Sequence, residues 1–471
     1  MRILFLQSLT YAYIGTMSLS AVLKKNGHEA DVFIMNMKRS SKSSLKKILE
    51  YDPDIVAFPV FTGWQKRILD VCGLLKNNFD VITVLGGPHP THCPEIVQHP
   101  AVDYICVGEA EVSFLELVNH LAIGKAANRI PGIWLKEAGN IINNGSSVLP
   151  NLEELPPMDI GLYCRNGNTI GLQENQSFSV NRGCPYQCTY CNSPSSYAIY
   201  GKKMIRSKTP DKAIEEIHYV YDQTPFKSVS FISDNLFLSK EFAREFLSKF
   251  KKQVGLPFYC QMRVEMIDVE IVNLLKDAGC HFVTLGIESG SERVRKQILN
   301  RSMRDEVIIK ACRLLQKAGI GISANNIIGI PGETFEEAWE TVSLNTKIRP
   351  SVSWCAIFQP YPGSRITRKL QDDGILSSDF YEKVPSTLFD KSILLGNNAH
   401  LFVNTQRLFQ LAVLFPRWQK ILQWFCKCKI PKVYDIVFLY SFYRHVRKAY
   451  KMTRCGAIKK ILQNAFEAKR A

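Results

Sequence analysis

The feature that most constrains the fold of this chain is an alternation of short, continuous apolar runs with amphipathic stretches. Continuous apolar runs are typical of strands buried on both faces, and amphipathic stretches are typical of the helices that cover them. The alternation occurs in two series, at residues 1–125 and 176–360. Because 471 residues are too many for one ordinary core, we expect an α/β protein with more than one domain.

The first series contains five strand-like runs separated by helix-like or turn segments. The runs are RILFLQ, ADVFIM, DIVAFPV, VITVLGG and DYICVG. Five such units predict a doubly wound, flavodoxin-like sheet of the Rossmann type, whose ligand would lie beyond the carboxyl ends of the strands.

The second series contains six strand-like runs, near FSVNRG, SVSFISD, PFYCQMR, FVTLGIES, ISANNIIGIP and SWCAIFQPY. Six βα units predict a (β/α)6 partial TIM barrel with its site at the carboxyl ends of the strands. Between the two series, GIWLKEAGNIINNG is typical of a small hairpin beside a proline-containing linker. The predicted divisions are a Rossmann-like domain (1–140), a linker with the hairpin (141–175), the barrel (176–375) and a helical C-terminal region (376–471).

The composition is that of a globular protein with free thiols. Hydrophobic residues make up 46% of the chain and charged residues 22%. Fourteen cysteines in so long a chain are too few for a secreted disulfide framework. The first residues, MRILFLQSLTYAYIG, lack the features of a signal peptide, and no apolar run is long enough to span a membrane. We therefore expect a cytoplasmic protein.

Most of the net charge of +16 comes from residues 401–471, which carry 15 Lys and Arg side chains against Asp435 and Glu467. Large apolar and aromatic side chains share this segment. Two interpretations remain open: a helical cap that packs on the barrel, or a surface that lies on an anionic membrane or beside a lipid-like substrate. Nucleic acid is not expected, because no recognised binding motif accompanies the charge.

The sharpest local signal is NRGCPYQCTYCNSP, in which Cys184, Cys188 and Cys191 form C-x3-C-x2-C after the first barrel strand. Three thiolates on one loop predict a four-iron cluster that keeps one iron free of protein ligands. Zinc is the alternative. A structural zinc site normally needs four ligands in two pairs, and no second Cys or His pair lies close by in the sequence.

With these residues, the region 176–365 resembles the radical S-adenosylmethionine (SAM) enzymes. In that family the open iron of a [4Fe-4S] cluster binds the amino and carboxylate groups of SAM, which is cleaved to a 5'-deoxyadenosyl radical. The resemblance implies that Tyr190 faces the adenine and that strand-end residues touch SAM or substrate. These strand-end residues are Asp234 and Asn235 in SDNLF, Glu288 and Ser289 in GIESGS, and Gly329 in IIGIPGET.

Arg263, in QMRVE, would suit the SAM carboxylate because a guanidinium group can donate two parallel hydrogen bonds. The alternative is structural: Asp234 and Glu288 would cap helices, and Arg263 would pair with one of them.

Two motifs make residues 1–140 resemble the cobalamin-binding domain that is fused to many radical SAM enzymes. They are GGPHPT (86–91) and VGEAE (107–111). Gly86 and Gly87 would let the backbone approach a bulky ligand tail in the sheet crevice. His89 is a candidate contact near the corrin or simply a turn residue, and Thr62 stands where relatives often have Ser. The motif D-x-H-x-x-G is absent, so cobalamin is expected to bind base-off, without that axial histidine.

The resemblance as a whole implies a cobalamin-dependent radical SAM enzyme, and the commonest activity of that group is methylation of an unactivated carbon. Two alternatives stay open: a cyclase or oxidative enzyme without methyl transfer, and a non-catalytic corrinoid-binding protein. The expected partners are a small-molecule or lipid-like substrate and an external electron donor such as flavodoxin or ferredoxin. The basic C-terminal region adds contact with the inner face of the membrane as a further expectation.

Overall fold

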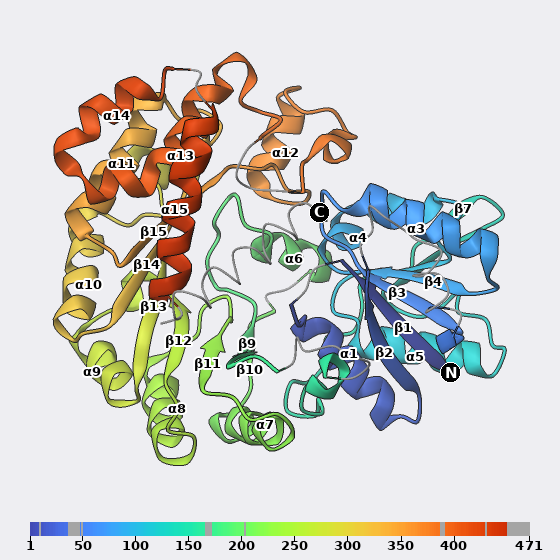
Figure 1. Ribbon diagram of the computed structural model, residues 1–471. Helices are drawn as coiled ribbons and strands as arrows, with labels where there is room; N and C mark the ends of the chain where they lie inside the picture. Colours follow the sequence, from blue (N-terminus) through green and yellow to red (C-terminus); the bar gives the residue numbers. More distant parts are fainter. Residues whose placement is uncertain are drawn as a thin grey trace.

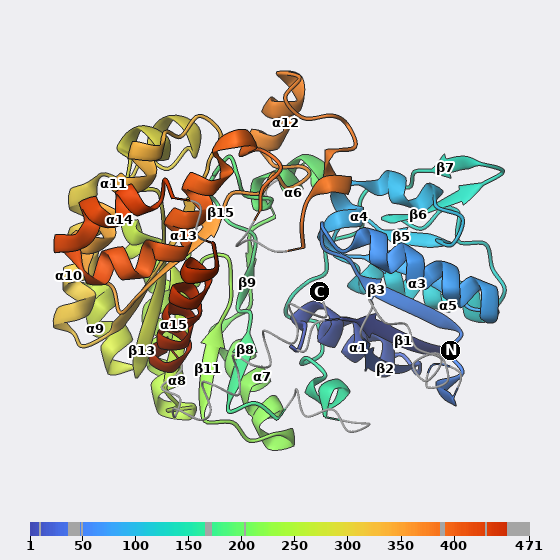
Figure 2. The same ribbon diagram turned by 45° about the horizontal axis from the view of Figure 1, so that its top comes forward.

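The computed structural model describes residues 1–8, 11–35, 48, 50–164, 172–201, 204–386, 391–428 and 431–449. They form two mainly parallel sheets in separate lobes, and a group of helices follows the second sheet in the chain (Figure 1). Figure 2 shows from a second angle that the segment around β9 and α6 lies between the lobes. The architecture confirms the predicted α/β class.

The first sheet has the strand order β2-β1-β3-β4-β5-β6-β7. Its first five strands in this order are parallel, which confirms the predicted doubly wound sheet. The predicted hairpin is formed by β6 and β7, and it pairs antiparallel with β5 and so extends this sheet. The strands are β1 (Arg2–Gln7), β2 (Glu29–Ile34), β3 (Ile55–Pro59), β4 (Ile82–Gly86), β5 (Tyr104–Cys106), β6 (Ile133–Glu137) and β7 (Asn140–Ile142).

Helices flank both faces of this sheet, so its central strands are buried as their apolar sequences require. The last five residues of β1 are all buried. The helical segments are α1 (Ile14–Lys25), α3 (Gln65–Asn78), α4 (Pro88–His92), η1 (Pro94–Gln98), α5 (Glu111–Ala122) and η2 (Ile160–Tyr163).

The second sheet has the order β15-β14-β13-β12-β11-β8, and all of its neighbouring strands are parallel. Its two outer strands, β15 and β8, are not paired with each other, so the barrel is open. Five of the six strands lie at the runs identified in the sequence, whereas β8 begins three residues before FSVNRG and shares only Phe178 with it. They are β8 (Asn175–Phe178), β11 (Ser228–Phe231), β12 (Phe258–Met262), β13 (Cys280–Glu288), β14 (Gly321–Ile328) and β15 (Val352–Ile357).

Several of the helices that flank these strands begin at a capping side chain. Ser239 accepts a hydrogen bond from the N–H of Phe242 (3.2 Å), and Thr334 forms a reciprocal capping box with Glu337. The helical segments are α6 (Ser193–Tyr200), α7 (Pro210–Gln223), α8 (Lys240–Gln253), η3 (Val264–Met266), α9 (Val269–Asp277), η4 (Val294–Ile298), α10 (Asp305–Lys317), α11 (Phe335–Ile348) and α12 (Arg365–Asp372).

The C-terminal region is helical, as predicted. α13 packs against α11 and β15, where Phe402 and Phe409 join a buried cluster with Trp339. Of the helices described, none is both long and apolar enough to cross a bilayer. The segments are η5 (Phe380–Lys383), η6 (Gly396–Asn398), α13 (Ala399–Leu414), η7 (Pro416–Trp418), α14 (Gln419–Phe425) and α15 (Pro431–Ala449).

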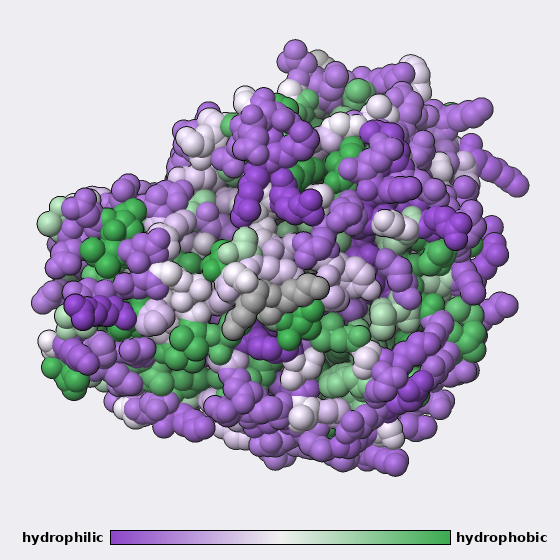
Figure 3. Space-filling model, turned by 180° about the vertical axis from the view of Figure 1, so that it is seen from behind, coloured by the Kyte–Doolittle hydropathy of each residue, from purple (hydrophilic) through white to green (hydrophobic). Residues whose placement is uncertain are grey.

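One large buried cluster joins the two lobes. It runs from Phe5 and Met17 in the first lobe, through Ile160 and Tyr163 in η2, to the strands of the barrel. The two lobes are therefore held together by a shared core. On the face of the surface seen in Figure 3, hydrophobic residues lie in separate groups among hydrophilic ones. Where one predicted domain ends and the next begins stays a prediction.

Candidate active site

The cysteine loop, residues 183–192, lies between the two lobes. It follows β9 (Asn181–Arg182), which pairs antiparallel with β10 (Arg206–Ser207), and it leads into α6. Gly183 begins the loop with φ +88°, and a Cβ atom there would lie 2.5 Å from the carbonyl oxygen of Met204. Only glycine fits this turn, which directs the loop toward the barrel.

Hydrogen bonds fix the loop to the segment that follows β13. The hydroxyl of Thr189 donates to the carbonyl of Ile298 (2.6 Å), and its N–H donates to the carbonyl of Leu299 (3.2 Å). Asn300 Nδ2 donates to the carbonyl of Gln187 (2.8 Å). These side-chain and backbone hydrogen bonds therefore hold the loop of the three cysteines against the segment after β13.

The three thiols of the loop differ in burial, and their role as cluster ligands stays a prediction. Cys188 is buried, and Cys184 and Cys191 are half-buried. Within the described part of the chain, no three Cys, His, Asp or Glu side chains converge as a single metal ion requires. Burial raises the pKa of the Cys184 and Cys191 thiols, so cluster binding would release their protons.

Two buried arginines lie beside Cys188. Arg263 Nη1 is 3.5 Å and Arg301 Nη1 is 3.7 Å from its sulfur. The Nε atoms of both arginines are buried and have no hydrogen-bond partner among the described residues. Buried donors are rarely left unsatisfied, so this pair suits an anionic ligand such as the SAM carboxylate as well as the thiolates.

The contacts of Arg263 differ from those of the structural alternative. Its Nη2 pairs with Glu265, and its guanidinium lies 3.6 Å from the ring centroid of Tyr186. The alternative that Arg263 pairs with Asp234 or Glu288 is wrong, because its carboxylate partner is Glu265, two residues later in the chain.

Glu288 ends β13 and is buried beside Tyr190 and Arg301. Its Oε1 lies 3.9 Å from Arg301 Nη1, and the Tyr190 hydroxyl is hydrogen-bonded to it. Burial raises the pKa of Glu288, although the charge of Arg301 and the hydrogen bond from Tyr190 oppose the rise. Its φ of +67° is uncommon for a residue other than glycine, and such strain clusters at functional sites.

Asp234 and Asn235, after β11, lie in different surroundings. Asp234 is exposed and accepts a hydrogen bond from Ser193 Oγ (3.1 Å) at the start of α6, next to the cysteine loop. Asn235 is buried, and its Nδ2 donates to the carbonyl of Phe237 (2.8 Å). The structure therefore brings Asp234 to the loop, while the Asn235 side chain shapes its own turn.

Ser289 and Gly329 shape two further strand ends. Ser289 is buried, and its hydroxyl accepts the N–H of Ser291 (3.2 Å). Gly329 has φ +72°, and its N–H donates to Glu333 Oε2 (2.6 Å). The roles of these residues, and of Tyr190, toward SAM stay predictions.

A cavity of about 550 Å³ lies beyond the carboxyl ends of the first sheet, where a ligand of the doubly wound fold was expected. Gly86 and Gly87 line it at the end of β4, and residues of β8 line its other side. Gly87 has φ +100°, and a Cβ atom there would lie 3.1 Å from the carbonyl oxygen of Val60. The missing side chain of Gly87 therefore allows close contact with the backbone of Val60, and the approach of a ligand to Gly86 and Gly87 stays a prediction.

His89 and Thr62 lie together but apart from the cavity lining. Thr62 Oγ1 is 3.1 Å from His89 Nδ1, and the buried His89 ring packs edge-on against Tyr381. Burial lowers the pKa of His89 to about 4, so its imidazole is neutral at physiological pH. Neither side chain is among the described residues that line the cavity, and their contact with a corrin stays a prediction.

Two arginines at the site were missed in the sequence. Arg301 belongs to LNRSMRDE, where it is one of several charged residues and no spacing marks it. Arg182 stands two residues before the first cysteine and lines the cavity. Its place directly before the cysteine motif was the one available signal.

Comparison with known proteins identifies two regions of the chain. Residues 178–344 match the Radical SAM superfamily, and residues 9–118 match the B12 binding domain. An uncharacterized methyltransferase of Pyrococcus horikoshii is 30% identical over 337 residues, which are 69% of this chain and 71% of the relative. The anaerobic magnesium-protoporphyrin IX monomethyl ester cyclase of Rubrivivax gelatinosus is 26% identical over 75% of this chain and 65% of the cyclase.

A solved structure shares the fold. The radical S-adenosylmethionine methyltransferase TsrM of Kitasatospora setae, with cobalamin and a [4Fe-4S] cluster bound, matches with a TM-score of 0.67. The match covers 79% of this chain and 75% of that protein, at 17% identity.

Proposed function

Because the chain belongs to the radical SAM superfamily and carries a B12-binding domain, we propose that it methylates an unactivated carbon of a small molecule. Its cofactors are those of the family: a [4Fe-4S] cluster, SAM and cobalamin. The observation that carries the proposal is the position of Arg182, which directly precedes the cysteine loop. Arg182 also lines the cavity beyond the carboxyl ends of the first sheet, called the interdomain cavity from here on. One substrate could therefore reach the groups bound at both places.

We assign the cofactors to residues as follows. Cys184, Cys188 and Cys191 hold the cluster, and Arg263 with Arg301 receives the carboxylate of SAM. The residues that we also assign to the binding site of SAM are Tyr190, Asp234, Asn235, Glu288, Ser289 and Gly329. Gly86 and Gly87 border the cobalamin. Thr62 and His89 are also given to the cobalamin site, although they lie outside the cavity lining.

When bound, these groups supply a methyl group and a 5'-deoxyadenosyl radical. The residues of the chain position the reactants and shield them from water. Arg263 and Arg301 orient the SAM carboxylate, and Glu288 offers a buried acceptor to its amino group. Holding the reactants in one geometry is a large part of catalysis in such enzymes.

A cyclase or oxidative reaction without methyl transfer is the second candidate. The observation that favours it is the similarity to the Rubrivivax cyclase over three quarters of the chain. Both candidates require cleavage of SAM at the cluster. They differ in whether the methyl group of a SAM molecule is transferred to the substrate.

The test is anaerobic reconstitution with iron, sulfide and cobalamin, followed by addition of SAM, a reductant such as flavodoxin and an extract of cells that lack the protein. SAM carrying a labelled methyl group should yield one labelled small molecule that also occurs in cells with the protein. The proposal is wrong if the reconstituted protein cleaves SAM but no molecule gains the label.

We also propose that the C-terminal helices bring the enzyme to an anionic membrane surface at the inner face of the membrane. Large apolar side chains stand exposed in succession from Phe415 through η7 and α14, while Leu422 and Cys426 of the same segment are buried. The sequence from 391 to 434 has no acidic residue. The exposed apolar residues, called the aromatic ridge, are Phe415, Trp418, Ile421, Trp424 and Phe425, with exposures of 37–60%.

Exposed cations flank the aromatic ridge at Arg417, Lys420 and Lys427. Aromatic and basic side chains together are typical of segments that lie in the headgroup region of an anionic bilayer. The cap interpretation accounts for α13, which packs on the barrel, but leaves this ridge without a role.

Co-sedimentation with anionic and neutral vesicles at low and high salt tests the membrane proposal. The full chain should favour anionic vesicles and lose binding as salt rises. Trp418→Ser with Trp424→Ser should abolish binding, whereas Tyr219→Ser, at an exposed tyrosine on α7, should not. Equal sedimentation of all three proteins, or none with either vesicle type, would leave the C-terminal region as a structural cap.

A further inference from the structure

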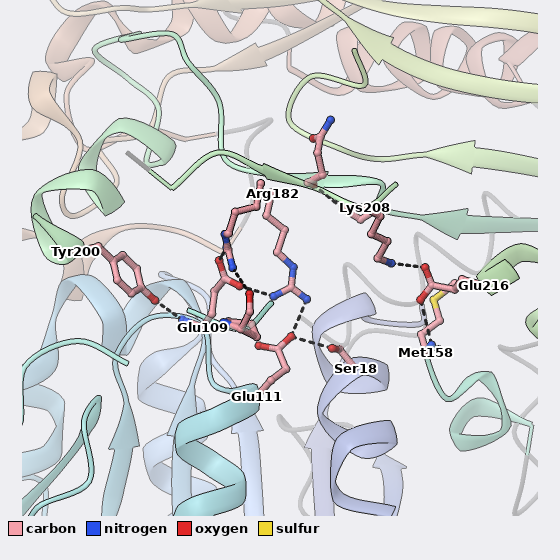
Figure 4. A network of polar contacts seen from close by, with 12 residues as sticks. Ser18, Glu109, Glu111, Met158, Arg182, Tyr200, Lys208 and Glu216 are labelled. Carbon is pink, nitrogen blue, oxygen red and sulfur yellow. Dashed lines mark hydrogen bonds and ion pairs between the residues drawn. The ribbon is translucent and has the colours of Figure 1, made fainter. Parts of the chain in front are cut away.

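A short segment of the first lobe, residues 108–111, contacts both flanks of the cysteine loop. We propose that this segment acts as a clamp that couples the geometry of the cysteine loop to ligand binding in the interdomain cavity. The clamp consists of Gly108, Glu109 and Glu111 in the first lobe, with Arg182, Arg206 and Tyr200 as its partners. Figure 4 labels Glu109, Glu111, Arg182 and Tyr200 among them.

The upstream flank of the loop is held by ion pairs. Arg182 Nη2 lies 2.7 Å from Glu111 Oε1, and its Nη1 pairs with Glu109. Arg206 stands directly opposite Arg182 in the β9–β10 pair and also binds Glu109. Two cations facing each other across strands would repel, so Glu109 between them stabilises the hairpin that begins the loop.

The downstream flank is held through Tyr200, the last residue of α6. Its hydroxyl accepts the N–H of Glu109 (2.7 Å) and lies 2.9 Å from Ser147 Oγ. Gly108 has φ +97°, and a Cβ atom there would lie 2.0 Å from the Tyr200 hydroxyl oxygen. The glycine of the VGEAE motif is therefore required for this contact.

Burial makes the clamp specific. Glu111 is only 4% exposed, and it also accepts a hydrogen bond from Ser18 Oγ (2.8 Å). Burial by itself would raise the pKa of Glu111, but the charge and hydrogen bonds of Arg182 and Ser18 lower it, so the carboxylate is ionised. A buried charge that loses its partner is strongly destabilising, so Arg182 and Glu111 hold each other in place.

The clamp also forms part of the cavity wall. Gly108, Glu109, Glu111 and Arg182 all line the interdomain cavity. A ligand seated there touches the groups that fix the loop at both ends. The inference rests on the proposed function in one respect, namely that cobalamin is the ligand of this cavity.

Hydrogen exchange of the cluster-free protein, with and without hydroxocobalamin, tests the clamp without any turnover. Binding, followed by absorbance, should slow exchange of the amides in residues 184–200 by about fivefold or more, the lower end of typical coupling between two sites. Tyr200→Phe should bind hydroxocobalamin but show less of this protection, and Arg182→Gln with Tyr200→Phe should lose it.

Arg244→Gln is the matched control, because Arg244 pairs with Glu270 on the exposed surface of α8 and α9. It should keep the full protection. Binding without protection in the unaltered protein, or equal protection in the Tyr200→Phe variant, would overturn the clamp and leave the proposed function standing. Failure of the unaltered protein to bind hydroxocobalamin would overturn both. Tyr200→Phe loses one hydroxyl only, so it decides the matter even if the double variant does not fold.

Discussion

At the scale of single residues, the three cysteines of the loop carry the sharpest expectation. Replacing Cys184, Cys188 or Cys191 by Ala removes a thiolate that the cluster needs. Each variant should lose bound iron after reconstitution and form no 5'-deoxyadenosine from SAM. Cys164→Ala is the control, since Cys164 is half-buried in another part of the fold. Full iron content and SAM cleavage in any one loop variant would contradict the cluster assignment.

Glu333 makes stability depend on pH. Burial raises its pKa to about 8, whereas an unfolded glutamate titrates near about 4.3. Between these values the folded chain holds a proton that the unfolded chain has lost, so stability falls as pH rises. Glu337, whose pKa the hydrogen bond from Arg293 lowers to about 2, titrates below this window.

Glu333→Gln keeps an acceptor for the N–H of Gly329 and removes the titration. The free energy of unfolding, measured in denaturant from about pH 5 to about pH 9, should therefore fall less steeply in the variant than in the unaltered protein. Parallel curves for the two proteins would show that Glu333 is ionised throughout.

Single residues also show which parts of the site could be predicted from the sequence and which could not. The spacing of Cys184, Cys188 and Cys191 predicted a cluster loop because three ligands on one short segment need no knowledge of the fold. Arg301 could not be found, since it reaches Cys188 only after β13 and the turn that follows have folded back. Arg263 was identified, but its partner Glu265 was not.

At the scale of elements, α11 offers a direct test of local stability. Thr334 caps this helix by accepting the N–H of Glu337 (3.2 Å). Thr334→Ala should cost about 1 kcal/mol of stability, as is typical for loss of an N-cap side chain. Ser343→Ala, in the interior of the same helix, should have little effect because alanine is the better helix former. Equal losses in denaturant unfolding would contradict the capping role.

The longer elements were predictable, and the short ones were not. The five parallel strands of the first sheet and five of the six barrel strands lie at the apolar runs, because strands buried on both faces are typically apolar. The exception is β8, whose sequence NQSF has three polar residues. β9 and β10 have two residues each, too few to show any period. They nevertheless carry Arg182 and Arg206, so the contacts that matter most between the lobes had no sequence pattern.

At the scale of the whole molecule, the VGEAE motif of the first lobe contacts residues on both sides of the cysteine loop, so the two lobes meet beside that loop. Composition and motif order indicated both lobes, and the doubly wound sheet indicated the edge where a ligand lies. The contacts between the lobes could not be predicted, since they join residues as distant in the sequence as Glu109 and Arg206, which are 97 positions apart. Contacts of that range depend on how the lobes pack.

The central claim is that one site between the lobes uses SAM both as methyl donor and as radical source. Measuring the co-products of turnover in the reconstituted protein, with extract as the source of substrate, tests it most directly. Methyl donation leaves S-adenosylhomocysteine, and radical cleavage leaves 5'-deoxyadenosine and methionine. We predict that S-adenosylhomocysteine and 5'-deoxyadenosine accumulate in equal amounts. Formation of 5'-deoxyadenosine without S-adenosylhomocysteine would contradict methyl transfer and favour the cyclase, and formation of neither would leave a corrinoid-binding protein without catalysis.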